Sequence, residues 1–369
     1  MRKKLKDVCD FYSGTGFPTQ YQGETEGDYP FYKVGDIANN ATAGNIYLEL
    51  CNNYISADVA KTIKGCILPK DTVVFAKIGE ALKLNRRAIT SCDCLIDNNA
   101  MGIAPKSDSL RIQYFYFFMK NLKMQSLAES TTVPSVRKTA LEEYEMEVPS
   151  LEEQKEIEKK LALTQEIIEK RKQELAAFDD LIKARFVEMF GDENNSLNWD
   201  IVNVEEVADV QVGVVIKPSQ YYTNETNGIK AFRSLNIGEG YIKDNDWVYF
   251  NNEGHHKNSK SILKENDLLI VRSGAPGTAC VVTKEYEGCN AIDIIIAHPD
   301  CEKVNPYYLC TYTNMPHGKR QIEGGTGGAA QQHFNIGKYN KLKLMLPPME
   351  LQEEYVSFVH QVDKSKVVV

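Results

Sequence analysis

The sequence predicts an α+β protein in which two duplicated, strand-rich domains are separated by long helices, and the two helices are expected to form an antiparallel coiled coil. Three observations support this prediction. One charged segment is repeated late in the chain, a forty-residue segment contains no helix breaker, and short β-branched runs fill much of the remaining sequence. The expected order along the chain is therefore domain, helix, domain, helix.

The repeat is clearest at the start of each predicted helix. The segment "VPSLEEQKEIEKKL", residues 148–161, is echoed by "LPPMELQEEYVSFV", residues 346–359, at a constant offset of 198 residues. Solenoid repeats recur every ~20–50 residues, so this spacing belongs to a different kind of duplication.

Three further blocks repeat in the same order, which indicates that whole domains are duplicated. The pairs are "DFYSGTGFPTQY" (10–21) with "DVQVGVVIKPSQYY" (209–222), "FYKVGDI" (31–37) with "AFRSLNI" (231–237), and "LPKDTVVFAKIG" (68–79) with "LKENDLLIVRSG" (263–274). We therefore predict domains over 1–147 and 192–346, and helices within 148–191 and 347–369.

Length and composition agree with this layout. A chain of 369 residues with 43% hydrophobic residues can build two or three domains with real cores. The start, "MRKKLKDVCDFYSG", lacks the apolar core of a signal peptide, and no apolar run approaches the ~18–20 residues of a membrane span. Nine cysteines without a C-x-x-C pair favour neither a disulfide framework nor a zinc site. We expect a soluble protein of the reducing cytoplasm that does not associate with membranes.

The first long helix is predicted over residues 151–190, which contain no proline or glycine. At 1.5 Å per residue it would extend about 60 Å. Ser150 is the expected N-cap, and Gly191 provides the stop. An apolar stripe needs a partner, for which we expect the second helix, beginning near Met349. The stripe comprises Leu151, Ile157, Leu161, Ile168, Leu175, Phe178, Ile182, Phe186 and Met189.

The globular parts have a different pattern. Runs such as "DTVVFAKIG" and "DLLIVRSG" are short, β-branched and bounded by turn residues, which predicts strands joined by long surface loops. Two aromatic segments, residues 109–123 and 305–314, are expected to form buried helices. Core packing explains their aromatic stripes better than base stacking does.

No catalytic or metal-binding motif is present. The glycine-rich segment 322–334 lacks the G-x-x-x-x-G-K-S/T pattern of a phosphate loop and is better explained as a mobile loop. His255 and His256 have no third ligand at a telling spacing. The tetrapeptides typical of amino-methyltransferases (N-P-P-Y/F, D-P-P-Y/W) and the G-x-G-x-x-G motif are also missing. We therefore expect a non-enzymatic chain that binds no cofactor or metal itself.

The net charge of −8 opposes general binding to a polyanion such as DNA. Its distribution weakens this objection, because residues 1–147 carry 18 basic and 18 acidic side chains. Nucleic-acid recognition would depend on local patches, although each patch alone is also explained by a solvated face. These patches are "KLNRR" (83–87), "VRK" (136–138) and "HGKRQ" (317–321).

Together, the order of parts resembles the DNA-specificity subunit of type I restriction–modification enzymes. The resemblance rests on the "GTGFPTQY" turn, "FYKVGDI", the "VPSLEEQ" helix ending in "FVEMFGD", the second domain and "LPPMELQEE". It implies that each domain is a target-recognition domain for one half of a split DNA target, and that the paired helices fix the distance between the halves. It also implies that the second helix, within 347–369, is truncated, because the family's distal helix ends in a stop like "FG".

The resemblance further implies the partners. Besides double-stranded DNA, these are two methyltransferase subunits and ATP-dependent restriction–translocase subunits, which would hold S-adenosylmethionine, ATP and Mg. Two alternatives stay open: a structural coiled-coil adaptor that carries duplicated domains, and the recognition subunit of a type II system whose partner fuses nuclease and methyltransferase. Salt-sensitive DNA retention would exclude the first, and the neighbouring gene would identify the second.

Candidate DNA contacts were selected for side chains that pair with base edges or grip phosphate. Equivalent cations of the two domains, Lys33 with Arg233 and Lys77 with Arg272, are better candidates for phosphate than for bases. The variable loops are expected to read the sequence. The candidates are Thr15, Gln20, Tyr21, Lys33, Lys77, Arg86, Arg87, Arg137 and Lys138 in the first domain, and Gln220, Tyr221, Arg233, Arg272, Ser273, Arg320, Gln331, Gln332 and His333 in the second.

Overall fold

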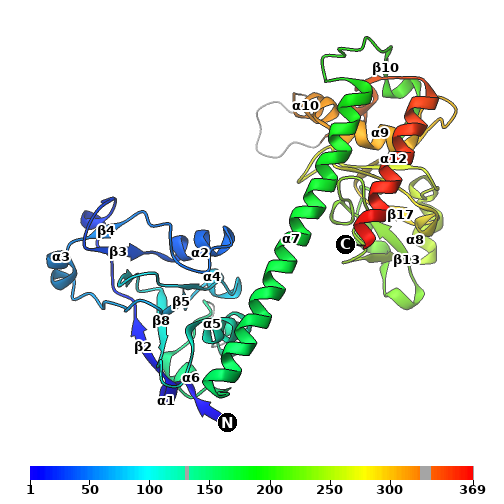
Figure 1. Ribbon diagram of the computed structural model, residues 1–369. Coiled ribbons are helices and arrows are strands. Elements are labelled where there is room, and N and C mark those ends of the chain that lie inside the picture. Colours follow the sequence, from blue (N-terminus) through cyan, green and yellow to red (C-terminus); the bar gives the residue numbers. More distant parts are fainter. Residues whose placement is uncertain (129–132, 325–333, 369) are drawn as a thin grey trace. The chain divides into compact units, whose positions relative to one another are not determined.

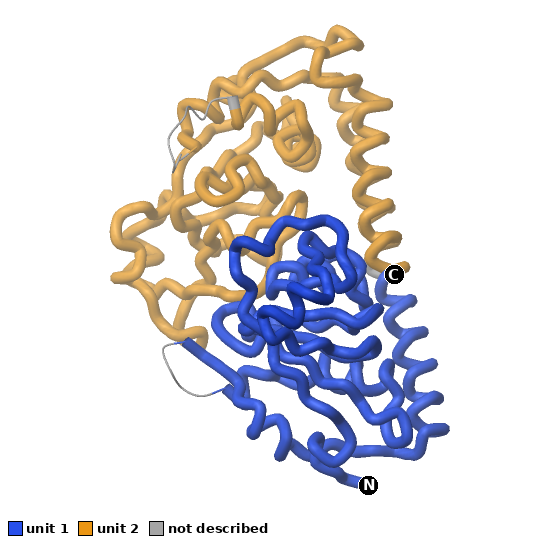
Figure 2. Tube along the Cα trace, turned by 90° about the vertical axis from the view of Figure 1, so that its left-hand side faces the viewer, with its two compact units in different colours: residues 1–169 blue, residues 170–369 orange. Residues whose placement is uncertain are grey.

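The structure is a computed structural model that describes residues 1–128, 133–324 and 334–368. The chain divides into two compact units, Met1–Glu169 and Lys170–Val369 (Figure 2). Each unit combines small sheets with short helices, which confirms the predicted α+β class. No helix among the described residues is long and apolar enough to cross a membrane.

Unit 1 contains a four-stranded sheet in the order β2-β8-β5-β6 and a three-stranded sheet in the order β4-β3-β7. The β1–β9 pair ties the start of the chain to the segment before the long helix. The strands are β1 (Arg2–Lys4), β2 (Cys9–Ser13), β3 (Tyr29–Tyr32), β4 (Tyr54–Ile55), β5 (Val73–Ala76), β6 (Ala88–Ile89), β7 (Leu95–Ile96), β8 (Ala100–Pro105) and β9 (Glu145–Glu147). The helices are α1 (Leu5–Val8), η1 (Thr19–Tyr21), α2 (Val34–Thr42), α3 (Ala57–Thr62), α4 (Glu80–Lys83), α5 (Ile112–Asn121), η2 (Met124–Leu127) and α6 (Lys138–Glu142).

Unit 2 repeats this plan with the sheets β11-β18-β15-β16 and β12-β14-β13-β17 and the pair β10–β19. Its strands are β10 (Ile201–Asn203), β11 (Ala208–Val212), β12 (Tyr222–Thr223), β13 (Ile229–Phe232), β14 (Val248–Phe250), β15 (Leu268–Val271), β16 (Ala279–Val281), β17 (Asn290–Ala291), β18 (Ile294–Pro299) and β19 (Lys343–Met345). Its helices are η3 (Val204–Glu206), η4 (Pro218–Tyr221), η5 (Glu225–Asn227), η6 (Ser234–Asn236), α8 (Asn252–Lys257), η7 (Ser259–Ser261), η8 (Lys284–Tyr286), α9 (Pro306–Asn314), α10 (Pro316–Gly324), α11 (Ile336–Asn340) and α12 (Met349–Val368).

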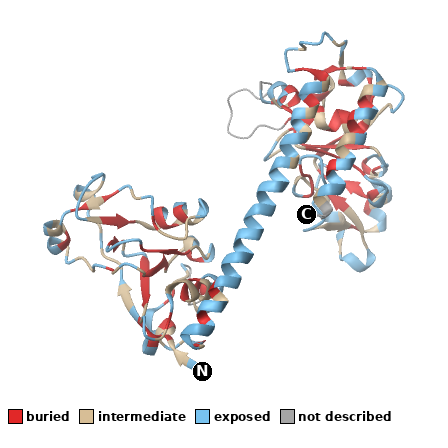
Figure 3. Ribbon diagram, in the orientation of Figure 1, coloured by how far each residue is buried: buried red, intermediate tan, exposed pale blue. Residues whose placement is uncertain are grey.

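The duplication extends to the way the strands pair. In unit 1, β2 pairs antiparallel with β8, and β3 pairs parallel with β7. In unit 2, β11 pairs antiparallel with β18, and β13 pairs parallel with β17. The aromatic helices α5 and α9 pack into the two cores, and Phe115 and Tyr308 are fully buried. This confirms that their aromatic residues serve packing. Figure 3 shows the buried segments of each unit in red.

The predicted long helix is α7, Leu151–Phe190 (Figure 1). Its N-cap forms as expected, because the Ser150 amide donates to Glu153 Oε2 at 2.9 Å while the Glu153 amide donates to Ser150 Oγ at 3.3 Å. Gly191 ends the helix with φ of 84°, a conformation that glycine adopts without strain.

Within unit 2, α12 runs antiparallel to the end of α7. Glu354 pairs with Arg185 at 2.9 Å, and Lys366 farther along α12 pairs with Asp179 earlier in α7 at 2.7 Å. The expected antiparallel pairing is confirmed for this part of α7. In the earlier part of α7, Leu161 and Ile168 of the stripe are exposed by 37% and 48%.

The two units differ in how the aromatic helix is covered. Tyr308 on α9 lies within 5.7 Å of the Phe186 ring and 4.9 Å of the Phe190 ring, measured between centroids. The equivalent Tyr114 on α5 is only half-buried and lines an open groove with Leu161. The end of α7 thus completes the core of unit 2.

Candidate nucleic-acid interface

The candidate interface is one rim of each unit, where the parallel strand pair ends and the chain crosses to the four-stranded sheet. In unit 1 the crossover segment is residues 97–99. The Asp97 amide donates to Tyr32 O at 3.0 Å, and the Lys77 amide donates to Asn99 O at 2.9 Å. Thr15 pairs with Asp97 in a parallel bridge. The predicted residues Thr15, Lys33 and Lys77 are therefore gathered around one segment.

Glycine allows a close backbone approach at this rim in both units, to the first crossover residue in unit 1 and to the last residue of β17 in unit 2. A Cβ atom on Gly14 would lie 1.7 Å from Asp97 O, and one on Gly213 would lie 2.3 Å from Ala291 O. Both neighbours are backbone atoms that cannot move aside. The same steric requirement therefore explains why both copies of the repeat have glycine at this position, Gly14 and Gly213.

The first pair of equivalent cations sits in matching turns. The Lys33 amide donates to Asp36 Oδ2 at 2.8 Å, and the Arg233 amide donates to Asn236 Oδ1 at 2.9 Å. Lys33 Nζ contacts Gln22 Oε1 at 2.5 Å, while the Arg233 guanidinium donates to a backbone carbonyl. Within the described residues neither cation has a carboxylate partner, so both keep an uncompensated positive charge at the rim.

The second pair of equivalent cations differs between the units. Arg272 Nη1 lies 2.5 Å from Asp293 Oδ1, and Arg272 Nε donates to Phe334 O at 3.2 Å. Its side chain is only 16% exposed, so Arg272 links the unit 2 crossover (residues 292–293) to the Phe334 carbonyl. Lys77 has no ion pair among the described residues. The expectation of one shared phosphate contact therefore suits Lys77 better than Arg272.

Arg87 was predicted to contact DNA, but the structure places it in the core. The residue is only 3% exposed, its guanidinium lies 4.9 Å from the centroid of the Phe75 ring, and it donates to Asn85 Oδ1 at 2.7 Å. Burial lowers the pKa of Arg87 to about 10. The "KLNRR" patch thus joins a half-buried Arg86 to a buried arginine that cannot reach DNA.

Other predicted residues are engaged within the fold. Thr15 Oγ1 accepts the Cys66 amide at 2.9 Å, and the Tyr221 ring packs 5.8 Å from the Phe250 ring. Arg320 forms an ion pair with Glu193.

The remaining predicted residues that the structure describes are exposed or half-buried. Gln20, Gln220 and Arg137 are exposed, whereas Tyr21 and Ser273 are half-buried. Lys138 is 46% exposed and lies 3.5 Å from Glu142. Gln331, Gln332 and His333 lie outside the described residues, so their predicted role stays a prediction.

Sequence reasoning missed the acidic residues of the crossover segments. Asp97 Oδ2 accepts the Val34 amide at 3.0 Å, and Asp293 holds Arg272. Both lie in loops that differ in length between the repeats and fall outside the repeated sequence blocks, so the repeat does not identify them.

No group of three potential metal ligands occurs in the part of the chain that the structure describes. His255 and His256 on α8 each make a hydrogen bond within the protein. His255 Nδ1 lies 2.8 Å from Asn290 Oδ1, and His256 Nδ1 lies 2.7 Å from Asn252 O. The rim can supply cations, amides and apolar side chains to a ligand.

Comparison with known proteins gives one consistent result. A family model described as the type I restriction modification DNA specificity domain matches residues 1–177 and 196–367. The specificity subunit of the type I restriction enzyme MjaIX from Methanocaldococcus jannaschii is 22% identical over 97% of this chain and 85% of that protein. The EcoBI specificity subunit from Escherichia coli is 19% identical over 98% of this chain and 78% of that protein.

Solved structures show the same fold. One, from a study of complex assembly and conformational transition of the type I R-M system, has a TM-score of 0.57 at 17% identity and covers all of this chain and 91% of that chain. The S subunit of a type I restriction–modification system from M. genitalium has a TM-score of 0.51 at 13% identity, covering 99% of this chain and 90% of that chain.

Proposed function

The chain belongs to the type I restriction modification DNA specificity family, and from this premise we propose that it recognises a DNA target in two parts, one by each unit. As the specificity subunit, it directs a partner adenine methyltransferase and an ATP-dependent restriction nuclease to that target. The proposal gives the chain a binding role and no catalytic step.

The observation that supports this proposal best is the rim built twice from equivalent parts. Gly14 and Gly213 each allow a close backbone approach, while Lys33 and Arg233 present cations from matching turns and have no carboxylate partner within the part of the chain that the structure describes. Two rims of one design, each on its own unit, suit a target with two separate halves. A cation without a carboxylate partner suits the phosphate backbone, which contributes much of the affinity of DNA-binding proteins.

The long helix supplies the second element of the proposal. Helix α7 enters both units, so we assign it the role of a spacer between the two recognised sequences. Half-sites of DNA-binding proteins commonly lie about one helical turn apart, or about 34 Å along the duplex. A helix of forty residues is long enough to bridge this separation.

The partners complete the proposed assembly. Two methyltransferase subunits and the restriction–translocase subunits would join the chain on double-stranded DNA in the cytoplasm. S-adenosylmethionine, ATP and Mg would be bound by these subunits, and this chain would bind none of them.

Methylome sequencing of the host with and without the gene tests the proposal. Loss of the gene should remove adenine methylation at one bipartite motif and leave all other motifs unchanged. Full methylation at every motif in the deletion strain would refute it. A structural adaptor would instead show no sequence preference in a DNA retention assay at moderate salt.

A further inference from the structure

The rim of unit 2 exposes large aliphatic side chains beside its cations. Ile216 is 79% exposed and Val215 is 50% exposed, both in the loop after β11. Leu235 is 63% exposed in the turn that Arg233 begins. Both segments flank the same stretch of backbone, because the Ile292 amide donates to Phe232 O at 2.8 Å and the Val214 amide donates to Ala291 O at 2.8 Å. Exposed aliphatic residues on such a surface mark interaction sites, because the fold gains little from leaving them in water.

The equivalent positions of unit 1 carry glycine. Leu235 corresponds to Gly35, because each follows a cation by two residues and precedes by one the residue that caps the turn, Asn236 or Asp36. The turn is thus the same in both units, while the side chain at this exposed position is a hydrogen atom in Gly35 and an isobutyl group in Leu235.

The loop after β11 shows the same contrast. Between the rim glycine and the following proline, unit 1 has "TGF" and unit 2 has "VVIK", so Gly16 is replaced by the exposed pair Val215 and Ile216. In unit 1 the remaining large side chain, Phe17, is turned inward and stacks on Phe31 at 3.8 Å between ring centroids. In unit 2, by contrast, Val215 and Ile216 remain in solvent.

Backbone hydrogen bonds fix the start of the exposed loop at Val214. The Val214 amide donates to Ala291 O at 2.8 Å, and the Asp293 amide donates to Val214 O at 3.2 Å. Lys217 then takes the left-handed conformation, with φ of 44° and ψ of 53°. This conformation is unfavourable for a residue with a Cβ atom, and such strain is found at functional sites.

A DNA surface offers one apolar feature that these side chains could recognise. In the major groove, the C5-methyl group of thymine is the aliphatic mark that distinguishes it from the other bases. We propose that Ile216 and Leu235 contact thymine methyl groups in the half of the target read by unit 2, while Arg233 beside them holds phosphate. This inference rests on the proposed DNA-recognition function and assigns sequence specificity to two residues of it.

The experiment uses the full chain and the target found by selection from random duplexes. Each thymine of the target is replaced in turn by deoxyuridine, which removes the methyl group and keeps the base pair. At one or two thymines of a single half-site, the wild-type chain should lose about fourfold in affinity, the effect of removing one buried methyl group. Ile216→Ala or Leu235→Ala should bind the thymine target more weakly and show no further loss with deoxyuridine at the coupled position.

Ile201→Ala is the matched control, because Ile201 is a 53% exposed isoleucine on β10. It should keep the wild-type response to every deoxyuridine. The inference is overturned if wild-type affinity is unchanged at all thymines, if the target has no thymine, or if both alanine variants keep the full methyl response. A chain that selects no sequence at all would overturn the proposed function as well, so the two failures are distinguishable.

Discussion

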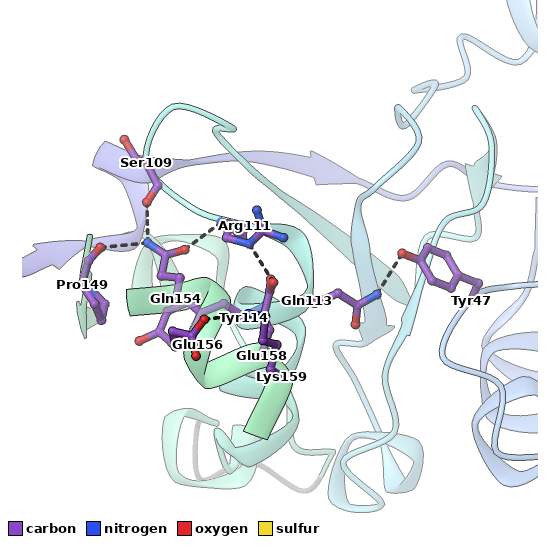
Figure 4. A network of polar contacts seen from close by, with 10 residues as sticks. All are labelled: Tyr47, Ser109, Arg111, Gln113, Tyr114, Pro149, Gln154, Glu156, Glu158 and Lys159. Atoms are coloured by element: carbon purple, nitrogen blue, oxygen red, sulfur yellow. Dashed lines mark hydrogen bonds and ion pairs between the residues drawn. The ribbon is translucent and has the colours of Figure 1, made fainter. Parts of the chain in front are cut away.

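Gln154 and Gln352 share two hydrogen bonds at equivalent places in the two repeats. Gln154 Oε1 accepts the Arg111 amide at 2.8 Å (Figure 4), and Gln352 Oε1 accepts the Asn305 amide at 2.8 Å, so each joins the start of a helix after the repeated proline to the start of an aromatic helix. Each glutamine also donates to the carbonyl of the proline five residues earlier. Both side chains are fully buried, which explains why the repeated segment keeps its glutamine.

Gln352→Ala should therefore destabilise unit 2. The substitution leaves the Asn305 amide and the Pro347 carbonyl buried without partners, and such a loss costs about 2 kcal/mol in the free energy of unfolding. The two tryptophans of the chain, Trp199 and Trp247, both lie in unit 2, so their fluorescence during urea unfolding reports this change. Gln361→Ala, on the exposed side of the same helix, is the control and should change stability by less than about 0.5 kcal/mol. Equal midpoints for both variants would contradict the anchoring role.

The stability of unit 2 should also decrease at mildly acidic pH. Burial lowers the pKa of His317 from its ordinary value of 6.5, although a hydrogen bond with Gly191 O acts in the opposite direction. Below pH 6.5, His317 is protonated in the unfolded chain but stays neutral in the folded protein until the pH reaches its lower folded-state pKa. The free energy of unfolding therefore falls as the pH decreases. Above about pH 7.5 both states are neutral and the effect is absent.

Urea titrations followed by tryptophan fluorescence between pH 5 and 8 measure this dependence. His317→Phe should flatten it, because phenylalanine can occupy the aromatic site beside Phe186 without titrating. His256→Gln is the matched control at an exposed histidine and should keep the wild-type slope. An unchanged slope in His317→Phe would show that other groups cause the pH dependence.

The spacer role of α7 predicts a change in the gap of the target. Deleting one or two helical turns between Leu161 and Leu175 removes about 5 or 11 Å of helix. The methylated motif should keep both half-sequences and shorten its central gap. Long-read methylome sequencing of cells that express the shortened chain, compared with the wild type, measures both features together. Altered half-sequences with an unchanged gap would exclude the spacer role.

Modularity gives a separate prediction. Replacing residues 192–346 by the matching domain of a relative should change one half of the methylated motif and preserve the other half and the gap. The reason is that unit 1 keeps its own sheets and core, formed from residues before Lys170. Changes in both halves would show that the units do not recognise DNA independently.

Sequence patterns predicted the parts of the fold that have regular spacing. The absence of breakers between Ser150 and Gly191 located α7, and the repeated blocks located the glycine and cation positions of both rims. Residue type alone did not predict which of two neighbouring residues is buried. Arg86 and Arg87 look alike in the sequence, but the strand β6 that follows them turns only Arg87 under Phe75.

The apolar stripe of α7 shows a second limit. Helical periodicity identified Leu161 and Phe186 as equivalent members of one stripe, yet Leu161 is 37% exposed and Phe186 is fully buried. Periodicity defines a face of a helix, whereas coverage of that face depends on which element reaches it. In the described residues, α9 and α12 reach only the last turns of α7.

The contrast between Arg233 and Arg87 yields the sharpest test of the proposed interface. Arg233 lies at the rim and has no carboxylate partner among the described residues, so Arg233→Ala should weaken binding to matched and mismatched duplexes alike. Losing one phosphate contact should also reduce the slope of log affinity against log salt concentration by about 1. Arg87→Ala should instead lower stability and leave that slope unchanged, because its guanidinium is enclosed by Asn85 and Phe75. Salt titrations on matched and single-mismatch duplexes compare the two variants directly. A shifted sequence preference in Arg233→Ala with an unchanged slope would move this arginine from the phosphate backbone to a base.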